Sequence, residues 1–241
     1  LLGKTNTPEF TLNFSTYNKM HGFTRNPYDL TRSPGGSSGG AAAAIATGMT
    51  AFDIGTDFGG SVRVPSHFCG TVGIKPTSGS ISRTGFCVPP GWLMDFMSHV
   101  GPMARRVEDL RLILPVIWGP DAIDTTIVPV PLANPDQVIP KGLRCAVMID
   151  NGITPPDEET IGAVRSAAAA LQDAGLAVCD DQLQGINQMR DVVSGLYQVG
   201  GYAHILSAID AAGTGQADIA NNWLIPPDPN EISEKDYAQW Q

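Results

Sequence analysis

The sequence predicts an α/β fold, and the clearest indication is a strand, helix, strand order in its second half. LRCAVMID (143–150) and LAVCD (176–180) are apolar strand candidates. Between them, TPPDEETIGAVRSAAAALQDAG (154–175) combines a capping box from Thr154 to Asp157 with early prolines, an acidic first turn and a closing glycine, so it predicts a helix. Strands connected in this way pair in parallel, which is the α/β arrangement.

Regular elements are sparser toward the N-terminus. The first 36 residues contain many turn formers and few periodic segments, and RNPYDLTRSPGG (25–36) predicts a surface-crossing loop. AAAAIATGM (41–49) predicts a short helix whose small side chains allow close packing against a neighbour. Short strands are expected in three segments: TAFDIG (50–55), VGIKPTSGSIS (72–82) and GPMAR (101–105).

Helices are also expected further along the chain. VEDLRLILPVIWG (107–119) predicts a helix that Pro115 would kink. Residues 182–212 read as mainly helical, followed by the loop IPPDPN (225–230) and the start of another helix capped by Asn230.

Length, composition and charge are those of a globular protein. The chain has 241 residues, 42% of them hydrophobic and 16% charged, which is enough for one large core or two modest ones. Its formal net charge is -9, and no block of like charge is present. Because nucleic acids and anionic membranes require clustered Lys and Arg, neither is expected as a partner. No apolar run is long enough to span a bilayer, so no membrane segment is expected.

The cysteines carry no metal or redox motif. The four residues are far apart in the sequence and form no CxxC pair: Cys69, Cys87, Cys145 and Cys179. Their apolar settings are typical of core positions, and we expect free thiols in a reducing cytoplasm.

Two clusters of glycine and serine, SPGGSSGG (33–40) and GTDFGGSVRVPS (55–66), are the most unusual features of the sequence. A flexible linker is disfavoured because both clusters lead directly into apolar segments. A phosphate-binding loop would expose backbone N–H groups before a helix, but no Lys-Ser, Lys-Thr or GxGxxG pattern follows.

A nucleophile elbow is a third alternative, since the GxSxG pattern is satisfied at Ser37 and at Ser38. An elbow requires an apolar strand before the serine, whereas the preceding NPYDLTRSP is polar and contains two prolines. A histidine base would have to come from one of four residues: His21, His67, His99 or His204. A lone histidine in an apolar setting is more often structural.

Together, the clusters belong to an ordered set of motifs that resembles the amidase signature family of serine hydrolases. The motifs are GKTNTPEF, NPYDLTRSPGGSSGGAAAAIATGM, DIGTDFGGSVRVPSHFCGTVGIKPTSG and GPMARRVEDL, and they cover roughly Leu2 to Val107. The resemblance implies an α/β fold with a mixed β-sheet core covered by helices, in which residues 1–241 form part of a single amidase signature domain. It also implies an N-terminal segment with the catalytic lysine and a C-terminal part that this chain does not contain.

The resemblance implies that Ser61 is the nucleophile and that Ser37 is a bridging serine, preceded by a cis peptide bond from Gly36. In the family a neutral lysine takes a proton from the bridging serine as that serine takes one from the nucleophile. The matching lysine lies upstream of this chain. We therefore expect Lys4 and Lys75, which fall in other motifs, to be structural.

The nucleophile loop supplies the remaining expected site residues. Negative charge develops on the carbonyl oxygen during attack, and fixed backbone N–H donors stabilise it. The resemblance implies donors in Phe58, Gly59, Gly60 and Ser61. Supporting roles, mainly in holding the loop through hydrogen bonds, are expected for Thr56, Asp57, Arg63 and Ser38.

Substrate-binding residues are less specific in the sequence. The resemblance places pocket residues at Phe10, Thr11 and Leu12, where plain core packing is an equal alternative. An apolar cluster in GWLMDFMSHV admits the same two interpretations, pocket wall or core: Trp92, Met94, Phe96 and Met97.

The resulting prediction is hydrolysis of a carboxylic amide through a serine acyl-enzyme, without metal or organic cofactor. The expected substrate is a small-molecule amide such as an aryl acylamide, or an ester or carbamate; a homodimer is one assembly that this function allows. One alternative is the glutaminase subunit of a tRNA-dependent amidotransferase, which would need protein partners. Another is a catalytically inactive scaffold or binding protein, because the chain lacks the family's lysine.

Overall fold

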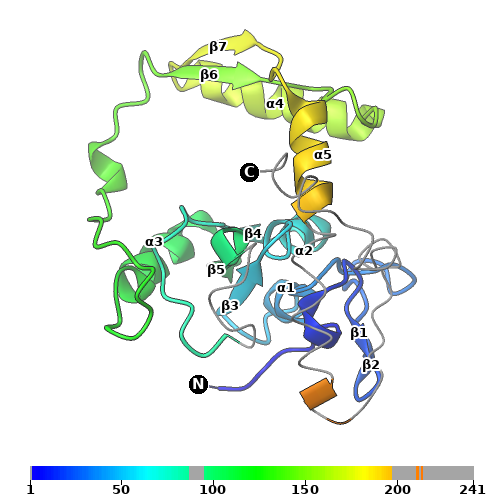
Figure 1. Cartoon of the computed structure of the whole chain (residues 1–241). Coiled ribbons are helices and arrows are strands. Elements are labelled where there is room, and N and C mark those ends of the chain that lie inside the picture. Colours follow the sequence, from blue (N-terminus) through cyan, green and yellow to red (C-terminus); the bar gives the residue numbers. More distant parts are fainter. Residues whose placement is uncertain (1, 87–94, 197–209, 212, 214–241) are drawn as a thin grey trace. The chain divides into compact units, whose positions relative to one another are not determined.

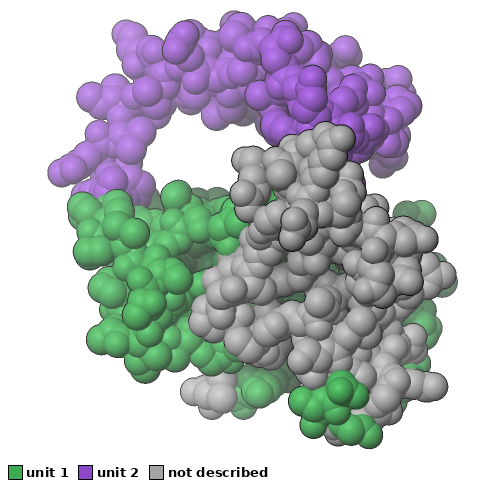
Figure 2. Space-filling model, viewed as in Figure 1, with its two compact units in different colours: residues 1–132, 196–241 green, residues 133–195 purple. Residues whose placement is uncertain are grey.

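A computed structural model describes residues 2–86, 95–196, 210–211 and 213 of the chain (Figure 1). The chain divides into two compact units (Figure 2). The first unit comprises residues 1–132 and 196–241, and the second comprises residues 133–195. Each unit is described by itself below.

A three-stranded antiparallel sheet forms the centre of the first unit (Figure 1). Its strands, in spatial order, are β3 (Phe52–Asp57), β5 (His99–Ala104) and β4 (Val72–Gly73). The register pairs Asp57 with His99 and Phe52 with Ala104. The last residue of β3 therefore lies beside the first residue of β5.

Two short helices pack against this sheet, α1 (Gly39–Ala46) and α2 (Arg63–Phe68). The start of α1 also lies close to the N-terminal segment, because a Cβ atom on Gly39 would lie only 2.2 Å from the hydroxyl oxygen of Thr16. The buried apolar core of the unit consists of Ala41, Ala42, Ile45, Val62, Cys69 and Met103. Each Gly-Ser cluster thus leads into a helix, and residues of α1 share one core with Val62 and Cys69, which flank α2.

Smaller elements complete the first unit. They are the 3-10 turn η1 (Glu9–Thr11), the hairpin strands β1 (Tyr17–Asn18) and β2 (Gly22–Phe23), the 3-10 turn η2 (Asp95–Met97) and helix α3 (Val107–Ile117). The hairpin lies within the first 36 residues, where the sequence showed few periodic segments. Helix α3 includes Pro115.

The second unit confirms the predicted strand, helix, strand order. Its elements are η3 (Pro135–Gln137), β6 (Arg144–Val147), α4 (Glu158–Asp173), β7 (Ala177–Asp180) and α5 (Ile186–Leu196), the last of which ends at the boundary between the units. Strands β6 and β7 pair in parallel over four residues each.

One local prediction was wrong. The expected capping box at Thr154 is not the start of α4, because the N-cap is Asp157, whose carboxylate accepts a hydrogen bond of 2.7 Å from the N–H of Thr160. The short strand expected within 72–82 is β4, which ends at Gly73. Pro76 lacks a backbone donor and Gly79 has φ of +77°, and both end regular pairing.

The remaining predictions for 197–209, 225–230 and Asn230 lie outside the described residues. In the part of the chain that the structure describes, no helix is both long and apolar enough to cross a membrane.

Candidate active site

The loop that carries Ser61 connects the end of β3 to the start of α2. Gly60 in this loop has φ of +128°, a conformation that residues with a side chain rarely adopt. A Cβ atom at Gly60 would also lie 3.0 Å from Cγ2 of Val64. The backbone before Ser61 therefore requires glycine, and Ser61 itself is buried.

The second serine loop precedes α1. The peptide bond between Gly36 and Ser37 is cis, as the resemblance implied, and Ser37 and Ser38 are both buried. The hydroxyl of Thr16 donates to the carbonyl of Gly35 at 2.8 Å and accepts from the N–H of Gly39 at 3.1 Å. Thr16 thus fixes the loop on both sides of its serines, a role that no sequence pattern indicated.

The fold brings the two serine loops together. The backbone N–H of Ser38 donates to the carbonyl of Ser61 at 3.1 Å. This approach depends on Gly55 of β3, since a Cβ atom there would lie 2.7 Å from Oγ of Ser38 and 3.0 Å from Cγ2 of Val62. Serines far apart in the sequence consequently occupy one site at the beginnings of α1 and α2.

A fully buried carboxylate, Asp57, organises the loop that carries Ser61. It accepts hydrogen bonds from the N–H groups of Gly60 at 2.8 Å and Val62 at 3.1 Å. Arg63 adds its own backbone N–H at 3.3 Å and two side-chain contacts, Nε at 3.0 Å and Nη2 at 2.9 Å. Burial opposes ionisation of Asp57, but the hydrogen bonds and charge of Arg63 and the N–H of Val62 hold its pKa below the usual range.

This network changes one expectation for the oxyanion hole. The resemblance implied a donor at Gly60, yet in this structure the N–H of Gly60 donates to the carboxylate of Asp57. The reason is that the carboxylate of Asp57 lies within the turn and accepts hydrogen bonds from the N–H groups of the loop. The other implied donors are Phe58, Gly59 and Ser61. Thr56 is half-buried and pairs with Val100 across the sheet.

The segment that follows η1 contacts both serine loops. A Cβ atom on Gly36 would lie 2.5 Å from the carbonyl oxygen of Asn13, and one on Gly60 would lie 3.9 Å from the ring of Phe14. Phe14 is exposed, so this aromatic ring borders the site without being part of the core. The sequence analysis missed Phe14, although it lies in the same FTLNF stretch as the residues that were named.

The expected substrate residues Phe10, Thr11 and Leu12 lie at the end of η1 and directly after it, where they are half-buried. Phe10 and Thr11 have φ of +52° and +59°, which is uncommon for residues with side chains and is typical of constrained loops near functional sites. In the other apolar cluster, Phe96 is exposed, whereas Trp92 and Met94 lie outside the described residues.

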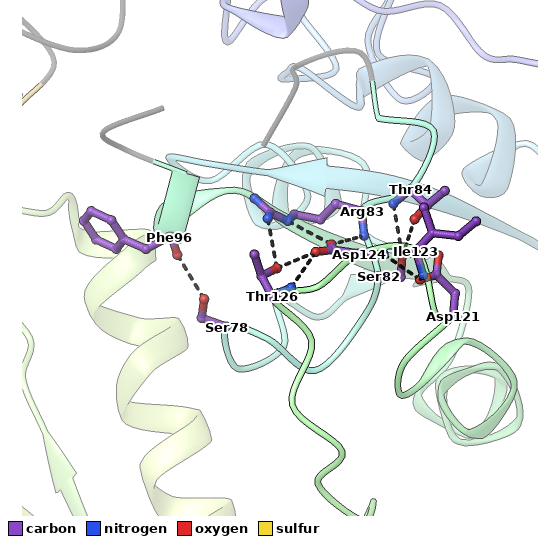
Figure 3. Close-up of polar contacts among 9 residues, drawn as sticks. All are labelled: Ser78, Ser82, Arg83, Thr84, Phe96, Asp121, Ile123, Asp124 and Thr126. Carbon is purple, nitrogen blue, oxygen red and sulfur yellow. Dashed lines mark hydrogen bonds and ion pairs between the residues drawn. The ribbon is translucent and has the colours of Figure 1, made fainter. Parts of the chain in front are cut away.

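A cavity of about 250 Å³ lies beside β5 in the first unit. Its walls come from three segments: Pro76–Arg83, Phe96–Val100 and Thr126–Val128. Hydrogen bonds and an ion pair hold these segments together (Figure 3). Arg83 lies 3.4 Å from Asp124 and donates to the hydroxyl of Thr126 at 3.0 Å, while Ser78 donates to the carbonyl of Phe96 at 3.2 Å.

The described residues contain no group of three or more His, Cys, Asp or Glu side chains that could hold a metal ion. Lys75 donates to the carbonyl of Pro76 at 2.9 Å, and Lys4 is exposed. The described cysteines are free, and burial raises the pKa of the Cys69 thiol to about 11.

Comparison with known families identifies the class of protein. The chain matches the family described as Amidase over residues 1–232. It therefore belongs to the amidase family, to which the paired serine loops already pointed.

Curated relatives include a glutamyl-tRNA(Gln) amidotransferase subunit of Moorella thermoacetica, which is 41% identical over 184 residues, covering 75% of this chain and 37% of the relative. The corresponding protein from a Synechococcus strain is 42% identical over 182 residues, covering 74% of this chain and 35% of the relative.

Among solved structures, 6-aminohexanoate cyclic dimer hydrolase with its substrate has a TM-score of 0.83 and 33% identity, covering 100% of this chain and 52% of the other. A bacterial aryl acylamidase of the amidase signature family has a TM-score of 0.76 and 27% identity, covering 99% of this chain and 50% of the other. These matches confirm the predicted α/β fold with its mixed β-sheet core. The chain spans about half the length of these structures and a smaller share of the curated relatives.

Proposed function

We propose that the complete protein hydrolyses a carboxylic amide through an acyl-enzyme on Ser61. The observation that carries this proposal is the hydrogen bond between the backbones of Ser38 and Ser61, which joins the two serine loops into one buried site. Membership of the amidase family supports it.

In the proposed reaction, Oγ of Ser61 bonds to the amide carbon while its proton passes to Ser37 and on to a lysine outside this chain. Backbone N–H groups of Phe58, Gly59 and Ser61 stabilise the negative oxygen. The C–N bond then breaks, the leaving amine takes up the relayed proton, and water hydrolyses the ester by the same route. Asp57 and Arg63 maintain the conformation of the loop through their hydrogen bonds. No metal or organic cofactor takes part in the proposed reaction.

The proposed substrate is a small-molecule amide. Two structural neighbours, named as a cyclic dimer hydrolase and an aryl acylamidase, support this class. The exposed ring of Phe14 beside Gly60 offers an apolar surface for such a substrate. Esters and carbamates react with the same nucleophile, so they are included in the proposed substrate class.

A second candidate function is that of a glutaminase within a larger complex. It is favoured by the curated relatives named as amidotransferase subunits, at 41% and 42% identity. This function requires partner proteins, so co-purification of the complete protein with such partners and release of ammonia from glutamine would favour it over the small-molecule amidase.

Three further proposals concern organisation and location. Residues 1–241 are part of a single amidase signature domain, because the family match runs across the boundary between the two units. The free cysteines among the described residues support a cytoplasmic location. The third proposal is that the complete protein forms a homodimer, which light scattering after gel filtration tests.

The experiment that tests the function is intact-mass labelling of the full-length protein with a fluorophosphonate, followed by turnover of a panel of anilides and of glutamine. We expect one adduct, lost in Ser61→Ala, together with anilide hydrolysis. Ser37→Ala is the matched control that should slow labelling without removing the labelled atom. An adduct that persists in Ser61→Ala contradicts the assignment, and no adduct in the wild type supports the inactive scaffold.

A further inference from the structure

We infer that His99 is a positioning residue of the nucleophile loop, whose ring bridges β5 to the end of β3 when both of its nitrogens carry a proton. This inference concerns the site of the proposed function and rests on it. It assigns a role to a histidine that the proposed reaction does not use.

The sheet register places His99 next to the residue that shapes the loop. His99 pairs with Asp57, and partners in an antiparallel pair project to the same face of the sheet. Asp57 is the last residue of β3, and its carboxylate takes the N–H groups of Gly60 and Val62. A group that restrains the backbone of Asp57 therefore restrains the start of the loop that carries Ser61.

The hydrogen bonds of the His99 ring define its neutral form. Nδ1 lies 2.6 Å from the carbonyl oxygen of Met97, and because a carbonyl only accepts, Nδ1 carries the proton. The neutral ring has one N–H, so Nε2 is then an acceptor. Nε2 is buried and has no hydrogen-bond partner among the described residues, a property it shares there only with the hydroxyls of Ser66 and Thr71.

A second proton would turn Nε2 from an acceptor into a donor. Burial and the charge of Lys75 lower the pKa of His99, while the carbonyl of Met97 and the backbone and charge of Asp57 raise it. The pKa of His99 is lowered overall. Because its pKa lies below the ordinary value, His99 is neutral at neutral pH and gains the second proton only in acid.

The charged groups around the ring come from three parts of the fold. They are Asp57 at the end of β3, Arg63 of α2, which is paired with Asp57, and Lys75 after β4. The bridge is open at neutral pH and closes as the pH falls, when Nε2–H donates to the carbonyl of Asp57. Closure leaves the covalent chemistry unchanged and alters the conformation of the loop.

Two substitutions separate the two ring nitrogens. In His99→Asn the shorter side chain places an amide near the position of Nδ1 and retains the bond to Met97. In His99→Gln the longer side chain places an N–H near the position of Nε2 and can donate to Asp57 at every pH. The same full-length protein carries both changes, which makes each variant the control of the other.

The first measurement is the amide chemical shift of Gly59 and Gly60 in full-length protein labelled with [15N]glycine, followed from neutral pH into acid as far as the protein stays folded, because the pKa of His99 is lowered. We expect these amides to titrate in the wild type with the midpoint of the His99 ring. His99→Gln should give the acid spectrum at every pH, and His99→Asn the neutral spectrum. Absence of the wild-type step, or identical spectra for the two variants, overturns the inference.

The second measurement is the rate of Ser61 labelling by the fluorophosphonate at neutral pH. We expect His99→Gln to react about threefold faster than His99→Asn, because fixed donors need no rearrangement during attack. A glutamine variant that reacts no faster overturns the positioning role. If the wild type is not labelled at all, the proposed function fails, whereas the amide shifts still decide the role of His99.

A third variant covers the case in which the glutamine variant does not fold. Lys75→Met removes the positive charge that lowers the pKa of His99, so the midpoint of the glycine shifts should rise. An unchanged midpoint would mean that the glycine shifts report a group other than His99, which overturns the inference.

Discussion

The first unit contains two aspartate–arginine ion pairs in which the carboxylate is buried. They have similar chemistry, but they connect residues at very different separations in the sequence. The side chain of Asp57 is 0% exposed and that of Asp124 is 5% exposed, so both carboxylates are removed from water. Their partners differ, because Arg63 is 53% exposed and is close to Asp57 in the sequence. Arg83 is only 11% exposed and is 41 residues from Asp124.

This difference indicates different tasks. Asp57 takes backbone N–H groups of the loop that follows it, so its network is local and sets the shape of a few residues around Ser61. Asp124 connects two irregular segments that share no strand, and it accepts from the backbone and side chain of Arg83 and from Thr126 (Figure 3). We expect the first pair to govern the chemistry and the second to govern stability.

The largest expected effect is on reactivity. Asp57→Asn removes a charge and an acceptor from the loop, so the N–H groups near Ser61 lose their fixed direction. We expect fluorophosphonate labelling of the full-length protein to slow by about 10²- to 10³-fold, the range seen when an oxyanion-hole donor is lost. Asp124→Asn makes the same chemical change in the other pair and is the control. Equal slowing of labelling in Asp57→Asn and Asp124→Asn would show that the Asp57 pair has no special role in reactivity.

The next effect is on stability. Asp124→Asn leaves the buried guanidinium of Arg83 without its opposite charge, which costs about 3 kcal/mol when one partner of a buried pair is removed. The measurement is the free energy of unfolding from urea denaturation, with labelling of Ser61 as the second readout. We expect lower stability and a labelling rate that stays within about threefold of the wild type, a change worth less than 1 kcal/mol. Unchanged stability would mean that the pair does not hold these segments.

A smaller effect is expected for Arg63→Lys. The guanidinium contacts both oxygens of Asp57, through Nε at 3.0 Å and Nη2 at 2.9 Å, and an ammonium cannot reproduce this fork. Because Arg63 is half exposed, water replaces part of the lost interaction. We expect labelling to slow by about tenfold, equivalent to about 1.4 kcal/mol, with little change in stability. Arg83→Lys is the control and should show the reverse pattern.

The same contrast explains how much could be predicted from the sequence. The helix of 41–49, the strand of 50–55 and the parallel pair around 154–175 follow from local patterns of apolar residues, caps and glycines. The loop residues Asp57 and Arg63 were also expected to form hydrogen bonds, since they flank Ser61 in the sequence. Local signals were sufficient wherever the contacts themselves are local.

Contacts between distant segments could not be predicted. Nothing in the surroundings of Arg83 indicates Asp124, and nothing near Thr16 indicates that its hydroxyl fixes Gly35 and Gly39. Likewise, the direction of the Gly60 N–H depends on a buried carboxylate, whereas the motif alone suggested an oxyanion donor. Such details are determined by tertiary packing, which a single sequence does not contain.

The smallest predicted effect is the pH dependence of the Asp124 pair. Burial opposes ionisation of Asp124, but hydrogen bonds from Thr126 and from the backbone of Arg83, with the charge of Arg83, hold its pKa below the usual range. A carboxylate with a lowered pKa in the folded state stabilises the protein above the pKa of the unfolded chain, about 3.9, and loses that contribution as the pH falls through the folded value. The difference in unfolding free energy between wild type and Asp124→Asn should therefore be constant above about pH 5 and shrink in stronger acid. A difference that persists unchanged at low pH would show that packing around Asp124, and not its charge, joins the two segments.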